Sequence, residues 1–162
     1  MYDELQKEIH SLLIGESIFI SNAANFAAHL YHNLPDVNWV GFYLQSYDDL
    51  LLGPFQGQMA CSRLPKGKGV CGDAAKTLQS IIVENVHAYT GHIACSPDSN
   101  SEIVIPLIKR NNFYGVLDID SPIFNRFSEE DKIGLESLVN ILMSVSDMTT
   151  LEKYYKFDYK HH

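Results

Sequence analysis

The chain has 162 residues, of which 46% are apolar, and it carries a formal net charge of −8 at neutral pH. This length and composition suffice for one hydrophobic core without support from disulfides or metals. No apolar stretch approaches the roughly 18 residues that a membrane span needs, and the polar start lacks the features of a secretory signal, so we expect a soluble cytoplasmic protein. Lysine and arginine are scattered along the sequence, which argues against binding to nucleic acid or to an anionic membrane surface.

Both ends of the chain show apolar residues at helical spacing. Residues 1–34 carry this pattern with an interruption at Gly15, which predicts two helices or one kinked helix. Near the other end, Ser128 followed three residues later by Asp131 is typical of a capping box. The helical pattern then continues, so we expect one long C-terminal helix over residues 128–155.

The middle of the chain carries the strand and loop signals. Runs rich in β-branched and aromatic residues predict strands over 37–45, 51–64, 81–85, 102–110 and 113–121. The second run is expected to be a broken strand pair, with Pro54 at an edge or a bulge. Asn111 and Asn112 tolerate positive φ and predict a tight hairpin between the last two strands. A loop over 65–72 is expected to lead into a short helix over 73–80.

No repeat, low-complexity tract or Pro/Ser-rich linker divides the sequence, so residues 1–162 are predicted to form a single domain. Residues 35–127 would supply the sheet and the active-site loops, and residues 156–162 a tail without assigned function. The order of elements predicts an α+β fold: a central, mostly antiparallel sheet with the N- and C-terminal helices packed on one face. The terminal helices could also pair two subunits into a homodimer, although the core alone already needs amphipathic faces.

Cys95 lies in an unusual place for a cysteine that only fills a core. The residues after it, Ser-Pro-Asp-Ser-Asn, favour turns over burial, so the thiol should be reachable by small molecules. If the backbone N–H groups of residues 92–95 turn towards a common point, they could hold an anion and lower the pKa of the thiol. The alternative is a half-exposed cysteine without a task.

Acidic residues gather on one predicted strand. Asp118 and Asp120 are two positions apart and therefore point to the same face, and Glu102 at the start of the partner strand could join them. Carboxyl groups this close resist ionising together, so one can keep its proton near neutral pH and act as an acid. The alternative is a solvated sheet edge.

Aromatic residues alternate along the strand over 37–45. Trp39, Gly41 and Tyr43 share one face, which predicts two aromatic walls with a gap between them for a small apolar group. An ordinary hydrophobic core would show the same pattern.

Two further sequence patterns give weaker evidence of function. Gly67, Gly69 and Gly72 match the dinucleotide-binding pattern G-x-G-x-x-G, but no clear βαβ unit surrounds them, so we expect them to serve tight turns or a close approach to a ligand. Zinc could find ligands among Cys61, Cys71, Cys95, His87 and His92, but the spacing fits no structural zinc site, and we expect no metal. Three cysteines in a reducing compartment also argue against a structural disulfide framework and leave free or redox-active thiols.

Several segments together resemble one known family. They are the strand NWVGFYL, MACSRLPKGKGVCG with Cys61 and Cys71, HIACSPDSNSEIVIPL with Cys95, and GVLDIDSP followed by FSEEDKIGLESL. With these motifs the chain resembles the GAF-domain free methionine-(R)-sulfoxide reductases over nearly all of the region from about Asp36 to Leu138. The resemblance implies reduction of free L-methionine-(R)-sulfoxide to L-methionine without flavin, haem or metal.

The resemblance also implies roles for the cysteines. Cys95 matches the nucleophile of the family, Cys61 its resolving partner, and Cys71 an accessory cysteine. Attack by Cys95 would leave a sulfenic acid, which a nearby thiol condenses to a disulfide, and a dithiol reductant, thioredoxin by resemblance, would restore the thiols. Whether Cys61 or Cys71 resolves first stays open.

The substrate contacts are assigned in the same way. By resemblance, Trp39 and Tyr43 form the walls around the substrate methyl group, while Glu102, Asp118 and Asp120 handle the ammonium group and the sulfoxide. Which of these acids carries the proton stays open. Backbone N–H groups near Ile93, Ala94 and Cys95 are expected to bind the substrate carboxylate.

Two other functions fit a GAF-type domain, because fold alone does not fix function. The chain could be a binding module that senses a small molecule, or a thiol redox sensor that forms the same disulfide without turnover. Release of methionine from the sulfoxide, dependent on Cys95, would distinguish the enzyme from both.

Overall fold

Six antiparallel strands form the centre of the molecule, whose computed structural model describes residues 1–159. Across the sheet the strands follow the order β3-β2-β1-β6-β5-β4, and every neighbouring pair is antiparallel. They are β1 (Trp39–Ser46), β2 (Asp49–Gly57), β3 (Arg63–Leu64), β4 (Ile81–Val83), β5 (Ser101–Lys109) and β6 (Asn112–Ser121).

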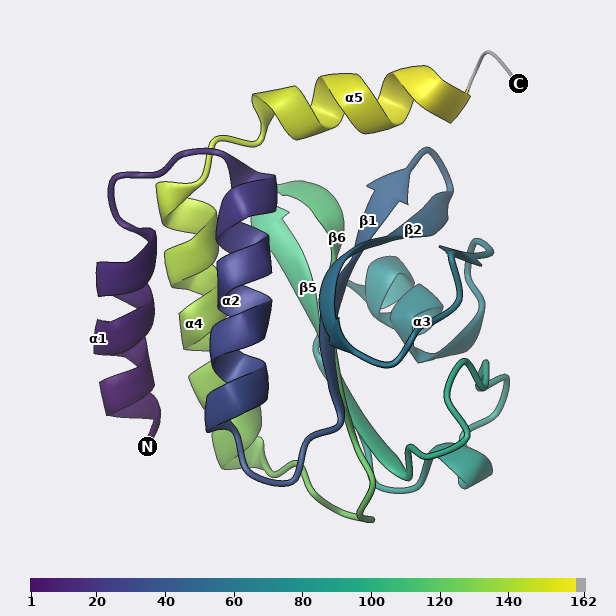
Figure 1. Ribbon diagram of the computed structural model, residues 1–162. Coiled ribbons are helices and arrows are strands. Elements are labelled where there is room, and N and C mark those ends of the chain that lie inside the picture. Colours follow the sequence, from purple (N-terminus) through teal and green to yellow (C-terminus); the bar gives the residue numbers. More distant parts are fainter. Residues whose placement is uncertain (160–162) are drawn as a thin grey trace.

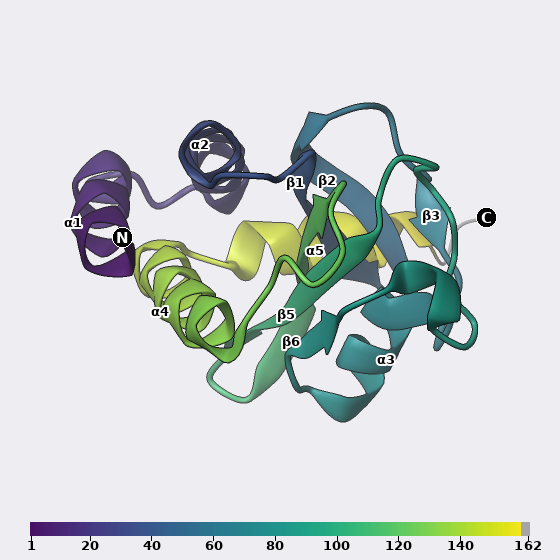
Figure 2. The ribbon, with the colours of Figure 1, turned by 90° about the horizontal axis from the view of Figure 1, so that it is seen from below.

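Helices cover both faces of this sheet, as Figures 1 and 2 show. They are α1 (Tyr2–Leu13), α2 (Phe19–Asn33), α3 (Gly69–Thr77), α4 (Glu129–Val145) and α5 (Thr149–Tyr159), with a short 3-10 helix, η1 (Val86–Ala88). α1, α2 and α4 lie on one face, and α3 lies on the other. The predicted α+β fold with terminal helices on one face is confirmed. Within residues 1–159, no helix combines the length and the hydrophobicity needed to cross a membrane.

The alternation along β1 explains why the sheet has two different faces. Val40, Phe42 and Leu44 are fully buried beneath the layer of α1, α2 and α4. Trp39 and Tyr43 point the other way, into a second cluster with α3. The larger core therefore stabilises the fold on one face, and the second face is left to build a site.

The N-terminal region forms two helices, which is the first of the two arrangements that its sequence allowed. α1 ends at Leu13, and Gly15 adopts a φ of 94°, a conformation that favours glycine. α2 then begins at Phe19 and lies beside α4 on the sheet.

The prediction of one continuous helix over 128–155 is wrong. The capping box of Ser128 and Asp131 is present at the start of α4, but α4 ends at Val145. Asp147 Oδ1 accepts a hydrogen bond from Thr149 N at 3.0 Å, and Asp147 N donates to Ser17 O at 2.8 Å. These bonds hold the chain out of a helical path between α4 and α5.

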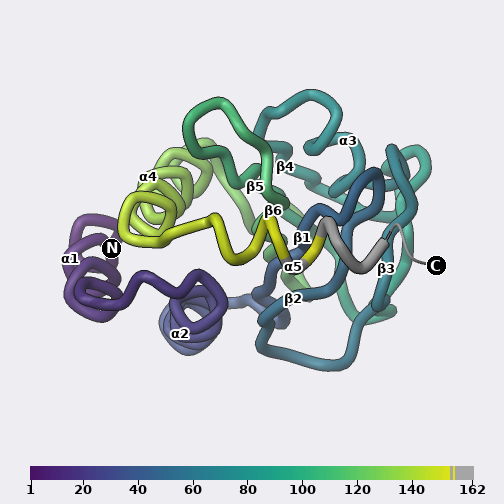
Figure 3. Tube along the Cα trace, turned by 90° about the horizontal axis from the view of Figure 1, so that it is seen from above, coloured from purple at the N-terminus to yellow at the C-terminus, as the bar shows by residue number. Residues whose placement is uncertain are grey.

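α5 runs across the end of the sheet (Figure 3). There Tyr114 OH donates to Glu152 Oε1 at 2.6 Å, and Ser46 Oγ donates to Tyr155 O at 2.7 Å. The predicted tail of residues 156–162 is helical as far as Tyr159, and its last three residues lie outside the described part of the chain.

Other local predictions hold with small shifts. Pro54 lies in a bulge of β2, since Gly41 pairs with Phe55 whereas Tyr43 already pairs with Leu52. The hairpin between β5 and β6 is present, but Arg110 and Asn111 take the positive φ values, so the turn lies one residue earlier than predicted.

The loop predicted over 65–72 is shorter, because α3 already begins at Gly69. Gly72 approaches Gly67 so closely that a Cβ on Gly72 would lie 2.7 Å from the carbonyl carbon of Gly67. The glycines of this segment therefore allow the turn and the first turn of α3 to pack together, as the tight-turn interpretation expected.

Candidate active site

The sheet register brings three acidic side chains onto the face covered by α3. Glu102 on β5 lies directly opposite Asp120 on β6, and Asp120 in turn lies opposite Trp39 on β1. Asp118 is two residues away from Asp120 on β6 and faces Gly41 on β1. Residues at these positions share one face, so the carboxyl groups converge as predicted.

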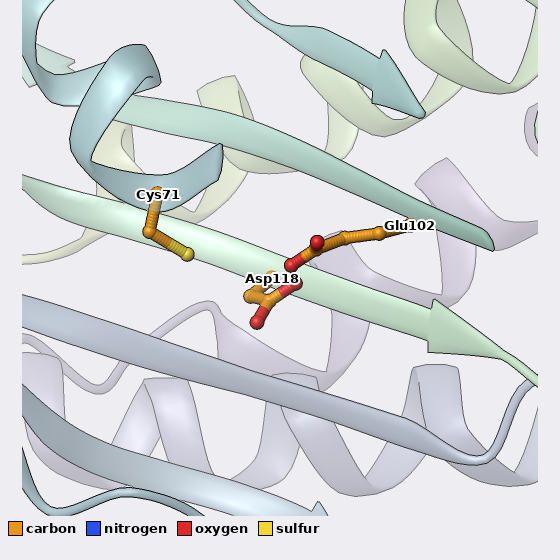
Figure 4. Close-up of side chains that lie close together, drawn as sticks. All are labelled: Cys71, Glu102 and Asp118. Atoms are coloured by element: carbon orange, nitrogen blue, oxygen red, sulfur yellow. The ribbon is translucent and has the colours of Figure 1, made fainter. Parts of the chain in front are cut away.

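Helix α3 adds a thiol to these acids. Cys71 lies in its first turn, and its side chain points toward the carboxyl groups of Asp118 and Glu102 (Figure 4). One donor atom from each of the three residues lies within 4.8 Å of the others. Burial and the charges of Asp118 and Glu102 raise the pKa of the Cys71 thiol well above its usual range.

The acids also perturb one another. Burial, followed by the charges of Asp120 and Glu102, raises the pKa of Asp118 well above its usual range. Burial and the charge of Glu102 raise the pKa of Asp120 in the same direction. Glu102 Oε1 and Asp118 Oδ1 are buried and have no hydrogen-bond partner among the described residues. The cluster therefore keeps protons to higher pH than ordinary carboxyl groups do, and it offers oxygen atoms that a ligand could engage.

A disulfide joins Cys61 to Cys95, with the two Cα atoms 5.4 Å apart. It links two loops separated by 34 positions in the sequence, whereas Cys71 is a free, buried thiol. The sequence left open whether Cys61 or Cys71 pairs with Cys95, and the oxidised structure contains the pair with Cys61.

Aromatic side chains complete the site on β1. Trp39 is stacked between Tyr43 and Phe55, at centroid distances of 6.0 and 5.3 Å. The indole also lies over Gly41, where a Cβ would approach its Cη2 atom to 2.5 Å. The gap predicted at Gly41 therefore makes room for the indole itself.

Both aromatic walls also hold the loop that carries Cys61. Trp39 Nε1 donates to Gln58 O at 3.0 Å, and Tyr43 OH donates to Cys61 O at 3.0 Å. These hydrogen bonds tie the position of the disulfide to the sheet.

The loop before Cys95 supplies only part of the expected set of backbone donors. Cys95 N donates to Ile93 O at 3.1 Å, and His92 N donates to Tyr89 O at 3.2 Å, so these two groups are engaged within the loop. The N–H groups of Ile93 and Ala94 have no acceptor within the part of the chain that the structure describes. They are the donors left for an anion.

A cavity of about 50 Å³ lies between these elements. The predicted residues that line it are Trp39, Tyr43, Cys71, Ile93, Cys95, Glu102, Asp118 and Asp120. Cys61 is linked to the cavity through its bond to Cys95, and Ala94 is an exposed residue of the loop that does not line it. In this disulfide form the cavity has room for one or two water molecules.

Comparisons with known proteins agree with this geometry. The model of the GAF domain family matches residues 18–147. The free methionine-R-sulfoxide reductase of Escherichia coli strain K12 is 49% identical over 154 residues, which cover 95% of this chain and 93% of that protein. The chain belongs to the GAF-domain free methionine-(R)-sulfoxide reductase family.

Solved structures of this family superpose closely. The reduced form of the Staphylococcus aureus enzyme has a TM-score of 0.86 at 47% identity, covering 88% of this chain and 93% of that one. The Neisseria meningitidis free methionine-R-sulfoxide reductase in complex with its substrate has a TM-score of 0.85 at 43% identity, covering 88% and 86% of the two chains.

Two features of this family member were missed at the sequence level. His92 lines the cavity with its Nε2 atom 3.8 Å from Glu102 Oε1, and was considered only as a zinc ligand. Its position three residues before Cys95 was the available signal. Phe55 extends the stack on Trp39, but its position depends on the bulge at Pro54, which the sequence did not place relative to β1.

The zinc set considered from the sequence does not assemble. Cys61 and Cys95 are bonded to each other, and the His87 ring lies 2.8 Å from Asn100 Oδ1, outside the cavity. The donors that do converge are Cys71, Glu102 and Asp118.

Proposed function

We propose that this protein reduces free L-methionine-(R)-sulfoxide to L-methionine with its own thiols. The observation that carries the proposal is the Cys61–Cys95 disulfide beside a cavity lined with buried acids. A disulfide there is the expected end of a thiol-driven reduction, and the acids meet the need of a sulfoxide for a proton. The relatives named free methionine-R-sulfoxide reductases support the same substrate.

The first step needs a nucleophile and an acid. A sulfoxide sulfur is a poor electrophile until its oxygen is protonated or strongly hydrogen-bonded, and a positioned acid typically contributes a factor of about a hundred or more. The Cys95 thiolate would attack the sulfur while Asp118 or Asp120, both with raised pKa values, supplies the proton. The bond between Cys95 Sγ and the methionine sulfur is transient: the sulfoxide S–O bond breaks as the oxygen is transferred to Cys95 Sγ, which becomes a sulfenic acid. The bond between the two sulfurs breaks at the same time, and methionine leaves with its sulfur reduced by two electrons.

The second step forms the disulfide. The Cys61 thiol attacks the Cys95 sulfenic acid, so that the S–S bond forms and one water molecule leaves. An external dithiol, thioredoxin in our proposal, then exchanges with this disulfide and becomes oxidised itself. A reductant of this kind fits a reducing compartment, and the proposal therefore includes a cytoplasmic location.

Selection of the free amino acid follows from the charges of the site. The carboxylates of Glu102 and its neighbours would bind the substrate ammonium group, and the N–H groups of Ile93 and Ala94 its carboxylate. A methionine sulfoxide residue within a peptide has neither charge, and would lose both contacts.

The test is turnover with thioredoxin and its reductase on three substrates: the free (R)-sulfoxide, the free (S)-sulfoxide and the N-acetylated, C-amidated (R)-sulfoxide. We expect methionine from the first only, no methionine with Cys95→Ser, and normal turnover with Thr90→Ala, an exposed change on the same loop. Equal yields from wild type and Cys95→Ser would exclude the proposed nucleophile. Tight binding without turnover would instead favour a sensor.

A further inference from the structure

Cys71, Glu102 and Asp118 form a donor set with the composition of a metal site. Their side chains come from three elements, α3, β5 and β6, and converge on one point (Figure 4). Only 5%, 6% and 7% of the respective residue surfaces are exposed. One donor atom from each lies within 4.8 Å of the others.

The buried oxygens of this cluster point to a cation. Glu102 Oε1 and Asp118 Oδ1 accept no hydrogen bond from another donor among residues 1–159, so only a proton shared between the acids, or a bound cation, can satisfy them. The neighbouring carboxyl of Asp120 makes the surroundings more acidic still, and of the cavity lining only Lys68 carries a permanent positive charge. A bound dication would satisfy both oxygens and remove the repulsion between the acids.

The thiol selects among dications. Mg²⁺ and Ca²⁺ prefer oxygen ligands alone, whereas a thiolate with carboxylates suits Zn²⁺ or Cd²⁺. Tetrahedral Zn–S and Zn–O bonds of about 2.3 and 2.0 Å place the donors about 3.3–3.5 Å apart, so donors up to 4.8 Å apart must close by up to about 1.5 Å. The cavity of about 50 Å³ accepts an ion with a water ligand, and His92 Nε2, 3.8 Å from Glu102 Oε1, is near enough to become a further donor.

We propose that the disulfide form of this protein binds one Zn²⁺ ion from solution through Cys71 Sγ, Glu102 and Asp118. On binding, the Cys71 thiol and whichever carboxyl is protonated release their protons to solvent. Such a metal is a site blocker and not a cofactor, because it occupies acids that the proposed function assigns to the substrate. Only that inhibitory consequence depends on the proposed function; the metal site does not.

Cd²⁺ is a spectroscopic probe of this site. In the disulfide form Cys71 is the one free thiol among the three cysteines of the chain, so a thiolate-to-cadmium charge-transfer band reports Cys71 alone. The oxidised protein is titrated with Cd²⁺ without any added dithiol, since dithiols bind the metal, and Zn²⁺ is then added as competitor. We expect the band to saturate at one Cd²⁺ per chain, to be displaced by Zn²⁺, and to be unaffected by Mg²⁺.

Variants distinguish a metal site with three ligands from binding of the metal by the Cys71 thiol alone. Cys71→Ser should abolish the band, and Asp118→Asn or Glu102→Gln should weaken Cd²⁺ binding by about tenfold or more, because even a residue that only supports a ligand costs that much. Asp48→Asn, an exposed acid outside the cluster, should bind like wild type. Absence of the band in folded wild type, or equal affinity in both carboxylate variants and wild type, would overturn the proposal. Turnover is not measured, so failure here leaves the proposed reductase activity untouched.

Discussion

Gly41 shows how a single residue shapes the site. It lies opposite Asp118 in the sheet and under the indole of Trp39, between the aromatic wall and the acids. The alternation of Trp39, Gly41 and Tyr43 could be predicted from the sequence. That the indole itself fills the gap could not be predicted. The direction in which the indole leans depends on its packing against Phe55, and a bulge in β2 positions Phe55.

The variant Gly41→Ala tests this reading. Its Cβ would meet Trp39 Cη2 at 2.5 Å and Phe55 Cβ more closely still. We therefore expect the indole and Phe55 to move, and the protein to lose about 1–3 kcal/mol of stability. Displacing a wall of the site should also raise KM for the sulfoxide. Because Trp39 is the single tryptophan of the chain, its fluorescence reports the displacement directly. An unchanged emission spectrum with unchanged KM would refute the assigned role of Gly41.

Asp118, a candidate proton donor in the proposed reaction, also affects stability through its raised pKa. Above the unfolded-state pKa of about 3.9, the folded protein keeps a proton here that the unfolded chain releases. The stability that this proton contributes is present at low pH and is lost as the pH rises through the folded-state pKa. The cost of the buried acid therefore grows towards alkaline pH.

Asp118→Asn should consequently be more stable than wild type by about 1 kcal/mol or more at pH 8, and the gain should shrink towards pH 5. Urea unfolding at both pH values measures the difference. Asp48→Asn, on the exposed surface, is the matched control and should change neither value. A stability difference that does not vary with pH would contradict the raised pKa.

Among the elements, the loop between η1 and β5 depends most on the disulfide. Hydrogen bonds hold the two ends of this loop, from Tyr89 OH to Asp73 on α3 and from Asn100 to Ser121 O and Pro122 O. Between these ends, the bond from Cys95 to Cys61 is the covalent tether. Ile93 and Cys95 of this loop line the cavity, so a change in the position of the loop changes the space available to a substrate. Reduction removes the covalent tether.

We therefore expect amide hydrogen exchange in residues 92–96 to accelerate by about tenfold or more when the disulfide is reduced, as is typical when a local tether is lost. Mass spectrometry of peptides from both forms measures it, with α2 and α4 as internal controls. Equal exchange of the loop in both forms would show that the disulfide does not restrain it.

Some helix and strand boundaries could be predicted from local sequence patterns, and others could not. The capping box and the alternating strands are local signals, and both could be predicted. The break between α4 and α5 carried a signal in Asp147 before Thr149, but the apolar periodicity on either side concealed it. The early start of α3 could not be predicted from glycine propensity, because the close approach of Gly72 to Gly67 is a tertiary contact.

At the scale of the whole molecule, the layer of α1, α2 and α4 stabilises the sheet from the side opposite the site. The ring of Tyr2 on α1 lies against Gly134 on α4, and Tyr2 OH donates to Asp131 Oδ1 at 2.6 Å. These contacts join the N-terminal helix α1 to the first half of α4. A homodimer through such helices, expected from the sequence, stays a prediction for light scattering to test.

Gly134→Ala should destabilise the protein although alanine favours helices. The new Cβ would lie 2.5 Å from Tyr2 Cδ1, and overpacking of this kind costs about 1–3 kcal/mol, more than the roughly 1 kcal/mol gained from helix propensity. Asn140→Ala, at an exposed position of α4, should show a small gain alone. Thermal unfolding distinguishes the two, and a stabilised Gly134→Ala would mean that α1 does not pack as described.

The central claim is that Cys95 reduces a bound sulfoxide and is then captured by Cys61. It is tested most directly by mixing fully reduced protein with one equivalent of free L-methionine-(R)-sulfoxide, without reductant, and mapping the disulfides by mass spectrometry. We predict one methionine per chain, a Cys61–Cys95 disulfide, and Cys71 still a thiol. Methionine formed at the same yield by Cys95→Ser, or a disulfide that contains Cys71 as the first product, would contradict this account.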